Sequence, residues 1–260
     1  MNNQQDRIRA SFTAQASGFS DPGLTLSNQK YIKWMTDSLP LKPEMNVLDL
    51  ACGTGIMSRA LAPFVRSVIG IDVTPAMLSQ ARVFAENEGL LNVEFHECPA
   101  ENTGFSPETF DLSVTRFSLH HFERPMHQLL EMVRVTKNEG CVAVIDLIAP
   151  SDPQMAVRYN EYERLRDPSH TIALSKDPLE ELIAGAKLTI REAKRLEVHV
   201  NVGRWLALTK APAITAERIV SDLEAEIEGR GPATGLSPSR DASGELVFQQ
   251  QWLIIVGIKK

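Results

Sequence analysis

The feature that most constrains the fold is a short apolar strand that runs into a glycine turn, at residues 47–55 (VLDLACGTG). The strand contains one carboxylate, Asp49, and a helix is predicted to begin at Ile56. Gly53 and Gly55 permit positive backbone dihedral angles and the close approach of a ligand. The helix directs its free N–H groups toward that ligand. An acid within the strand and only two close glycines suit a pyrophosphate poorly, but they suit an amino acid with a cationic centre.

Strands and helices alternate through the first 150 residues. The sequence predicts strands over 47–50, 67–71, 93–96, 110–115 and 141–147, and helices over 56–62, 75–88 and 125–136. Pro75 in the first turn of a helix and Gly89 just beyond its end are the expected asymmetry. Strands separated by helices pair in parallel through right-handed crossovers. A ligand is therefore expected beyond the carboxyl ends of the strands, beside the first one.

The pattern changes after Pro150. Helices are predicted over 152–167, 178–187, 204–210 and 215–228, strands over 188–200, 246–248 and 252–258, and a loop over 229–244. A helical insert between the sixth and last strands is a natural lid. We therefore expect a single domain over 1–260 with lid segments at 1–30, 151–170 and 200–245.

Composition limits the classes of partner. A net charge of −6 gives no attraction to a polyanion such as nucleic acid. No stretch approaches the roughly 20 apolar residues that span a bilayer, and residues 1–10 lack the apolar core of a signal peptide. Three cysteines, sparse and odd in number, favour a reducing cytoplasm over a disulfide framework. Their spacing matches no set of metal ligands, so we expect no metal site.

An acid follows the second predicted strand. Asp72 lies 19 residues after Gly53 and can accept hydrogen bonds from both ribose hydroxyls of an adenosine, although a solvated acid at a strand end is the alternative. The same position would serve NAD, so Asp72 alone does not select the cofactor. The dinucleotide fingerprint, however, requires a glycine where this chain has Ser58, and it gives no role to Asp49. Both residues argue against a nicotinamide cofactor.

The glycine turn resembles motif I of the class I S-adenosylmethionine (SAM)-dependent methyltransferases. The residues that fall in family order are Asp49, Ala51, Cys52, Gly53, Thr54 and Gly55. The resemblance implies a Rossmann-like, doubly wound α/β sheet of seven strands in the order 3-2-1-4-5-7-6, with the last strand antiparallel and with helical lid insertions. It also implies that Asp49 helps to hold the methionyl ammonium group, often through water. The resemblance covers most of the chain and is strongest over 47–147.

Two further segments resemble the parts of this family that surround adenine. Val73 and Met77 are implied as its apolar walls, with helix core as the alternative for Met77. Family members commonly have an Asp followed by Ala after the third strand, whereas this chain has Pro99 before Ala100. Adenine recognition would then rest on the backbone of Ala100 and on Glu101, for which a surface acid is the alternative.

Residues 110–122 (FDLSVTRFSLHHF) resemble the fourth strand and following loop of the ubiquinone/menaquinone-methyltransferase-like (type 11) subgroup. This loop would face the sulfonium and the acceptor. Because histidine titrates near neutral pH, His120 or His121 could remove the proton of the acceptor. Adjacent side chains point differently, so at most one should reach it, and both could instead hold the loop. Arg116, which we place with the cofactor site, could bind an anionic group or pair with a loop acid.

Two outer segments are predicted to contact the acceptor. Residues 160–170 (NEYERLRDPSH) look like a segment of a bacterial branch of small methyltransferases in this subgroup, although a solvated helix ending in a proline turn would read the same way. The candidate acceptor-side residues there are Arg164, Arg166 and His170. Phe19 stands where the subgroup usually has a Tyr that folds over SAM, with a plain amphipathic helix as the alternative. Trp205, in the lid insert, completes the predicted acceptor side.

The sequence therefore predicts methyl transfer from SAM to a small molecule, by in-line displacement at the sulfonium methyl group. Whether carbon, oxygen, nitrogen or sulfur is methylated stays open. One alternative is a SAM-binding protein of the same fold that acts as a cyclase or regulator without methylating. A less favoured one is a nicotinamide-dependent oxidoreductase.

Overall fold

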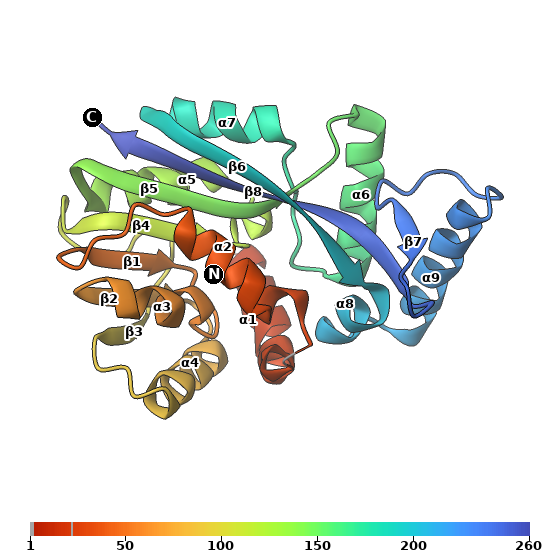
Figure 1. Cartoon of the computed structure of the whole chain (residues 1–260), viewed down its shortest axis with the longest axis horizontal. Helices are drawn as coiled ribbons and strands as arrows, with labels where there is room; N and C mark the ends of the chain where they lie inside the picture. The colour runs from red at the N-terminus through yellow and green to blue at the C-terminus, as the bar shows by residue number, and fades with distance from the viewer. Residues whose placement is uncertain (1–2, 22) are drawn as a thin grey trace.

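The computed structural model describes residues 3–21 and 23–260, and a mixed sheet with the strand order β3-β2-β1-β4-β5-β8-β6 forms its centre. The first five strands are parallel: β1 (Asn46–Leu50), β2 (Ser67–Asp72), β3 (Val93–Glu97), β4 (Phe110–Arg116) and β5 (Thr136–Ile148). The last strand, β8 (Leu246–Lys259), runs antiparallel between β5 and β6 (Leu188–Asn201) (Figure 1). The predicted fold class and strand order are confirmed, with β8 as the seventh strand of the family pattern.

The C-terminal strand differs from the prediction. The two short strands predicted over 246–248 and 252–258 are one continuous strand, β8, and a short strand within the predicted loop, β7 (Pro238–Arg240), pairs with it. Three glutamines, at 249–251, separate the two apolar runs in the sequence. Gln250 is nevertheless buried within β8. Its Nε2 donates to the hydroxyl of Tyr159 at 3.1 Å, and its Oε1 accepts from Nε1 of Trp252 at 2.8 Å. These bonds let a polar residue lie in the middle of a core strand.

Helices cover both faces of the sheet, as expected for parallel strands. Val47 belongs to the core beneath α2 (Gln29–Asp37) and α3 (Ile56–Leu61), whereas its neighbour Leu48 faces the opposite core, beneath α5 and α7. The bounds of the remaining sheet helices are α4 (Pro75–Asn87), α5 (Pro125–Val135) and α7 (Lys176–Gly185). Helix α2 was not predicted, although Asn28 caps it by accepting from the backbone N–H of Lys30.

Strands β6 and β8 run past the other strands and carry a group of helices at their far end (Figure 1). This group contains α6 (Pro153–Arg166), α8 (Val202–Leu208) and α9 (Ala213–Ile227). The N-terminal helix α1 (Asn3–Gln15) and the short helix η1 (Ala16–Ser20) lie near α4 and α8, at the carboxyl ends of the parallel strands. Within the described part of the chain, no helix is both long and apolar enough to cross a membrane.

Candidate active site

The turn after β1 has the backbone that its sequence predicts. Ala51, Gly53 and Gly55 have positive φ angles of 58°, 54° and 72°. A Cβ atom on Gly55 would lie 2.8 Å from the ring of Phe95, so glycine is needed there for packing as well as for conformation. A Cβ atom on Gly53 would meet nothing within 4 Å, because that glycine borders open space. The turn therefore presents bare backbone to a cavity.

Asp72 closes this turn from the end of β2. Its Oδ2 accepts from the backbone N–H of Gly53 at 2.9 Å, and its Oδ1 accepts from the backbone N–H of Thr74 at 2.8 Å. Burial raises the pKa of Asp72 despite these bonds. The carboxylate is thus fixed in orientation at the cavity wall, where its remaining lone pairs suit the two hydroxyl groups of a ribose.

A cavity of about 430 Å³ lies over the carboxyl ends of the parallel strands, within the range typical of small-molecule sites. The predicted cofactor residues that line it are Ala51, Cys52 and Gly53 after β1, Asp72 at the end of β2, Val73 and Met77 after β2, Ala100 and Glu101 after β3, and Arg116 in β4. The predicted catalytic and acceptor residues that line it are His120, His121, Phe19, Arg166 and Trp205. Residues from seven parts of the sequence thus meet at one sheet edge.

Asp49 lies behind the cavity wall and is 1% exposed. Its Oδ2 accepts from the hydroxyl of Ser58 at 2.6 Å, so the serine that replaces the third dinucleotide glycine holds this carboxylate. Burial raises the pKa of Asp49 to about 6, with the bond from Ser58 acting in the opposite direction. Any contact of Asp49 with a ligand therefore passes through water or through the backbone of the turn.

The high pKa of Asp49 predicts that SAM binding releases protons. An approaching ammonium group favours the ionised carboxylate, so binding lowers this pKa, and affinity falls as the pH drops below about 6. At pH 5.5 we expect the release of about 0.5–0.8 proton per SAM from this group. Calorimetry in two buffers with different ionisation enthalpies measures the release, and Asp49→Asn should lower it. Equal proton release by the two proteins would contradict the assignment.

The two histidines occupy a short helix, η4 (Leu119–His121), after β4. Nδ1 of His120 lies 2.6 Å from Oδ1 of Asp146 in a pair that is almost fully buried. Burial by itself would lower the pKa of His120, but the charge and hydrogen bond of Asp146 outweigh it, and the pKa is raised. Since Nδ1 is engaged, Nε2 is the nitrogen that a ligand in the cavity can meet. The sequence reasoning missed Asp146, an acid in the apolar strand β5, just as Asp49 is in β1.

His121 is held in a different state. Burial, followed by the charge of His120, lowers the pKa of His121 to about 4. Its Nδ1 lies 3.1 Å from the hydroxyl of Ser169, and the ring of Phe12 packs edge-on against it at 5.0 Å. His121 is therefore neutral at physiological pH and fixed between α1 and the loop after α6.

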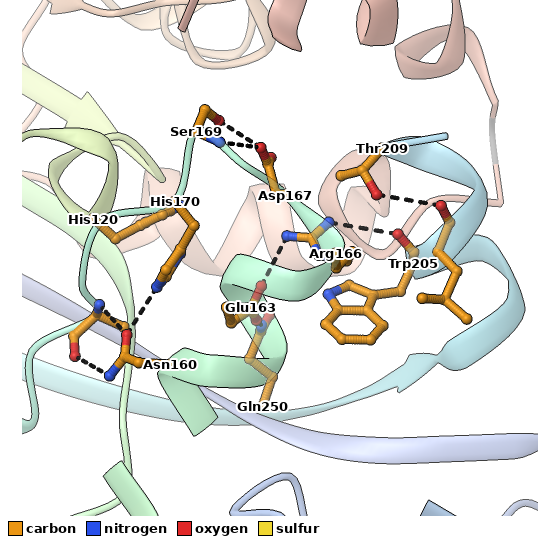
Figure 2. Close-up of polar contacts among 12 residues, drawn as sticks. His120, Asn160, Glu163, Arg166, Asp167, Ser169, His170, Trp205, Thr209 and Gln250 are labelled. Atoms are coloured by element: carbon orange, nitrogen blue, oxygen red, sulfur yellow. Dashed lines mark hydrogen bonds and ion pairs between the residues drawn. The ribbon is translucent and has the colours of Figure 1, made fainter. Parts of the chain in front are cut away.

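Arg166 and Trp205 meet at the far side of the cavity (Figure 2). The guanidinium carbon of Arg166 lies 4.8 Å from the centre of the indole ring, and its Nη2 pairs with Oε2 of Glu163 at 2.9 Å. Nε of Arg166 and Nε1 of Trp205 are buried, and the described part of the chain offers neither of them a hydrogen-bond partner. Two unpaired donors in a largely apolar wall suit an oxygen atom of a ligand.

Two predicted acceptor-side residues lie elsewhere. Arg164 is exposed, and its Nη1 donates to the carbonyl of Thr171 at 3.1 Å. The prediction for Arg164 is therefore wrong. Residues two positions apart in an α-helix point in directions about 200° apart, and it is Arg166 that points toward the cavity. His170 is buried behind His120, with its Nε2 2.8 Å from Oδ1 of Asn160 (Figure 2). It does not line the cavity either.

Arg116 does not form the predicted ion pair with a loop acid among the described residues. It lines the cavity, but its guanidinium donates to the carbonyl of Leu26, and its Nε contacts the sulfur of Met35 at 3.3 Å. Burial lowers the pKa of Arg116 to about 10. Within residues 3–21 and 23–260, no acid forms an ion pair with it. The arginine thus joins the N-terminal segment to the end of β4.

Helix α1 covers the cavity. Nε2 of Gln4 donates to the carbonyl of His121 and to the hydroxyl of Thr171, the latter at 3.0 Å. At the other end of the helix, Nε2 of Gln15 donates to Oδ2 of Asp167 at 3.1 Å. Both glutamines are buried. The helix is therefore fastened at both ends to the walls of the cavity.

The three predicted lid segments differ in their placement. Residues of α1 and η1 line the cavity, as do Arg166 and Asp167 from the second segment. From the third, the lining consists of residues in 200–208 only; among the described residues, none in 209–245 takes part. Helix α9 instead buries Ile219 and Leu223 in the core with α6 and β8. That part of the predicted lid is structural support.

Loosening α1 is expected to accelerate the loss of bound SAM. Gln4→Ala combined with Gln15→Ala removes buried bonds at both ends of the helix, and we expect an increase of about tenfold in the dissociation rate, because each buried bond contributes about 1 kcal/mol. Amide exchange in α1 should also become faster. The control is Arg7→Ala with Arg9→Ala, which removes the ion pairs to Glu123 and Glu97 that lie on the surface and contribute little. Equal rates in the two double variants would contradict a covering role.

The described residues contain no group of three or more His, Cys, Asp or Glu side chains that could hold a metal ion.

The chain is similar to proteins of known family. Residues 47–140 match the family described as methyltransferase domain. The uncharacterized methyltransferase YcgJ of Bacillus subtilis (strain 168) is 30% identical over 189 residues, which are 73% of this chain and 75% of that protein.

Two further comparisons agree with this match. The ubiquinone/menaquinone biosynthesis C-methyltransferase UbiE of Citrifermentans bemidjiense is 27% identical over 164 residues, 60% of this chain and 70% of that protein. The crystal structure of YcgJ superposes with a TM-score of 0.80 at 26% identity, covering 90% of this chain and 99% of that chain. A putative methyltransferase from Bacillus halodurans C-125 gives a TM-score of 0.79 at 26% identity, covering 88% of this chain and 99% of that chain.

Proposed function

The chain belongs to the class I SAM-dependent methyltransferases of the UbiE-like type, and from this premise we propose that it methylates a small, largely apolar molecule whose reacting atom must give up a proton. SAM is its cofactor. The cavity fits this cofactor because Asp72 presents a fixed carboxylate to it beside the bare backbone of Gly53. We propose that these two residues hold the adenosyl and methionyl parts, with Val73 and Met77 as apolar walls.

The observation that carries the proposal is the buried pair of His120 and Asp146 at the cavity wall. A carboxylate that binds Nδ1 fixes the orientation of the imidazole and stabilises its protonated form. A general base of this kind is not needed if the acceptor is already deprotonated at neutral pH. It therefore supports an acceptor with an O–H group or an acidic C–H group.

When bound, SAM supplies an electrophilic methyl group, whose bond to sulfur breaks as the acceptor atom bonds to its carbon. Nε2 of His120 takes the proton of the acceptor as that bond forms, and Asp146 offsets the charge that develops on the ring. Nε of Arg166 and Nε1 of Trp205 bind an oxygen atom of the acceptor and orient it. Helix α1 keeps water away, which strengthens these electrostatic interactions.

The walls of the acceptor side support an apolar molecule. Phe19, Leu24, Leu26, Phe117 and Leu208 line the cavity together with the indole ring of Trp205. The relative named for ubiquinone/menaquinone biosynthesis supports a hydroxylated ring as one such acceptor. The unpaired cysteines agree with a cytoplasmic location, where thiols stay reduced.

An acceptor panel tests this proposal. The purified protein is incubated with SAM that carries a labelled methyl group and with quinols, phenols, enolisable ketones, amines and thiols. We expect label in a hydroxylated or enolisable apolar compound, at a rate that rises with pH as His120 loses its proton. Label in amines alone would overturn the proposed acceptor class but leave the methyltransferase assignment in place.

A further inference from the structure

Helix α5 contributes to the cavity wall a side chain whose carbonyl oxygen is buried without a partner among the described residues. Gln128, on α5, lines the cavity and is 6% exposed. Across the described chain, its Oε1 finds no hydrogen-bond donor. An unpaired carbonyl oxygen in a buried position costs free energy, so this wall of the cavity is complementary to a donor that a ligand brings.

Helix α5 is fixed against the loop that follows β3. Oε1 of Glu131 accepts from the backbone N–H of Thr103 at 2.8 Å and from its hydroxyl at 2.6 Å. Gln128 precedes Glu131 by three residues, so it lies on the same face of the helix, one turn toward its N-terminus. Both Gln128 and Ala100, three residues before Thr103, line the cavity. The amide therefore belongs to the wall formed between α5 and this loop.

The order of the strands indicates which part of the cofactor reaches this wall. His120 follows β4, whereas Asp72 ends β2 and Ala100 follows β3, at the opposite end of the lined edge. If the ribose binds Asp72, the base lies on the side away from His120. The nearby carboxylate of Glu101 already accepts a bond from Gln5 of α1.

We infer that the carboxamide of Gln128 recognises the amino edge of the adenine ring of SAM. That edge presents an N–H donor beside a ring nitrogen that accepts, and a carboxamide offers the complementary pair, with Oε1 accepting and Nε2 donating. Pro99, in the loop that Glu131 of α5 binds through Thr103, has no side-chain acceptor and no backbone N–H. Gln128 thus supplies the specificity for adenine that the loop after β3 lacks. The inference rests on SAM as the cofactor.

The test measures by calorimetry how tightly two ligands bind to the unaltered protein and to variants of Gln128. The ligands are S-adenosylhomocysteine and its analogue with purine in place of adenine, which lacks only the amino group. We expect the unaltered protein to bind the adenine form about tenfold more tightly. Gln128→Leu should bind S-adenosylhomocysteine about tenfold more weakly and should no longer distinguish the two ligands. Gln128→Met, of similar length, is the second variant and should behave in the same way.

The matched control is Gln80→Leu. Oε1 of Gln80 is also buried without a partner in the part of the chain that the structure describes, but Gln80 does not line the cavity. Gln80→Leu should keep the full preference for adenine. Both leucine variants should unfold at or above the temperature of the unaltered protein, because each removes an unpaired polar group; only Gln128→Leu should show a smaller increase on adding S-adenosylhomocysteine.

Two outcomes would contradict the inference, and they can be told apart. A Gln128 variant that keeps the preference for the adenine form would overturn the role of this residue while SAM remains the cofactor. An unaltered protein that binds neither ligand would instead contradict the cofactor on which the inference rests.

Discussion

Replacing His120 with alanine is expected to lower kcat about 100-fold or more, while the dissociation constant for SAM changes little. The reason is that His120 faces the acceptor side and is oriented by Asp146 through a bond of 2.6 Å. Its loss removes the proton acceptor from the transition state without altering the cofactor site. Turnover with a hydroxylated acceptor and SAM binding by calorimetry together measure the two effects.

His121→Ala is the matched control for this variant. The pKa of His121 is lowered to about 4 and its Nδ1 faces Ser169, so its loss should loosen α1 more than it slows the chemical step. Asp146→Asn should move the midpoint of the pH–rate profile to lower pH, because the negative charge that raises the pKa of His120 is removed. Full turnover by His120→Ala would exclude this residue as a base.

Asp72→Ala is expected to weaken SAM binding by about 1.5–3 kcal/mol, or about 10- to 150-fold, because hydrogen bonds to a charged acceptor are lost. The variant also frees the backbone N–H groups of Gly53 and Thr74, so the turn is loosened as well. Calorimetry with SAM and S-adenosylhomocysteine should give the same loss for both ligands.

A variant of a second carboxylate, Asp111, distinguishes a loss of SAM affinity from a loss of folding stability. Asp111 also accepts from a backbone N–H, that of Asn46 at 2.8 Å, but it does not line the cavity. Asp111→Ala should lower the unfolding temperature without a change in SAM affinity. If Asp111→Ala weakens SAM binding as much as Asp72→Ala does, the effect of Asp72 is a general loss of stability.

The sequence was most informative for elements whose conformation depends on residues that are close together in the chain. The turn after β1 could be predicted because Gly53 and Gly55 must adopt positive φ and because a carboxylate at the end of the next strand faces them. Strands β1 to β5 and helices α3 to α5 could be predicted because alternating apolar residues and proline or glycine boundaries are local signals. In β8, by contrast, three consecutive glutamines concealed a core strand, since the bonds that satisfy Gln250 come from Tyr159 and Trp252.

The acceptor side was the hardest part to predict, because its contacts are long-range. Nothing local distinguishes Arg164 from Arg166; the direction of each depends on how α6 lies against α8. Asp146 is bound to His120 from another strand, and Gln128 is placed by the contact of Glu131 with Thr103. An acid within the apolar strand β5 was a usable signal for Asp146, whereas Gln128 gave none.

Methyl transfer itself is tested most directly by following SAM with a trideuterated methyl group. The protein is incubated with this SAM and a small-molecule extract, and the products are analysed by mass spectrometry with His120→Ala as the comparison. We expect an apolar compound to gain one trideuterated methyl group, in amounts equal to the S-adenosylhomocysteine formed, and much more slowly with His120→Ala. Bound SAM that stays intact with every acceptor, or label found only in macromolecules, would contradict small-molecule methylation.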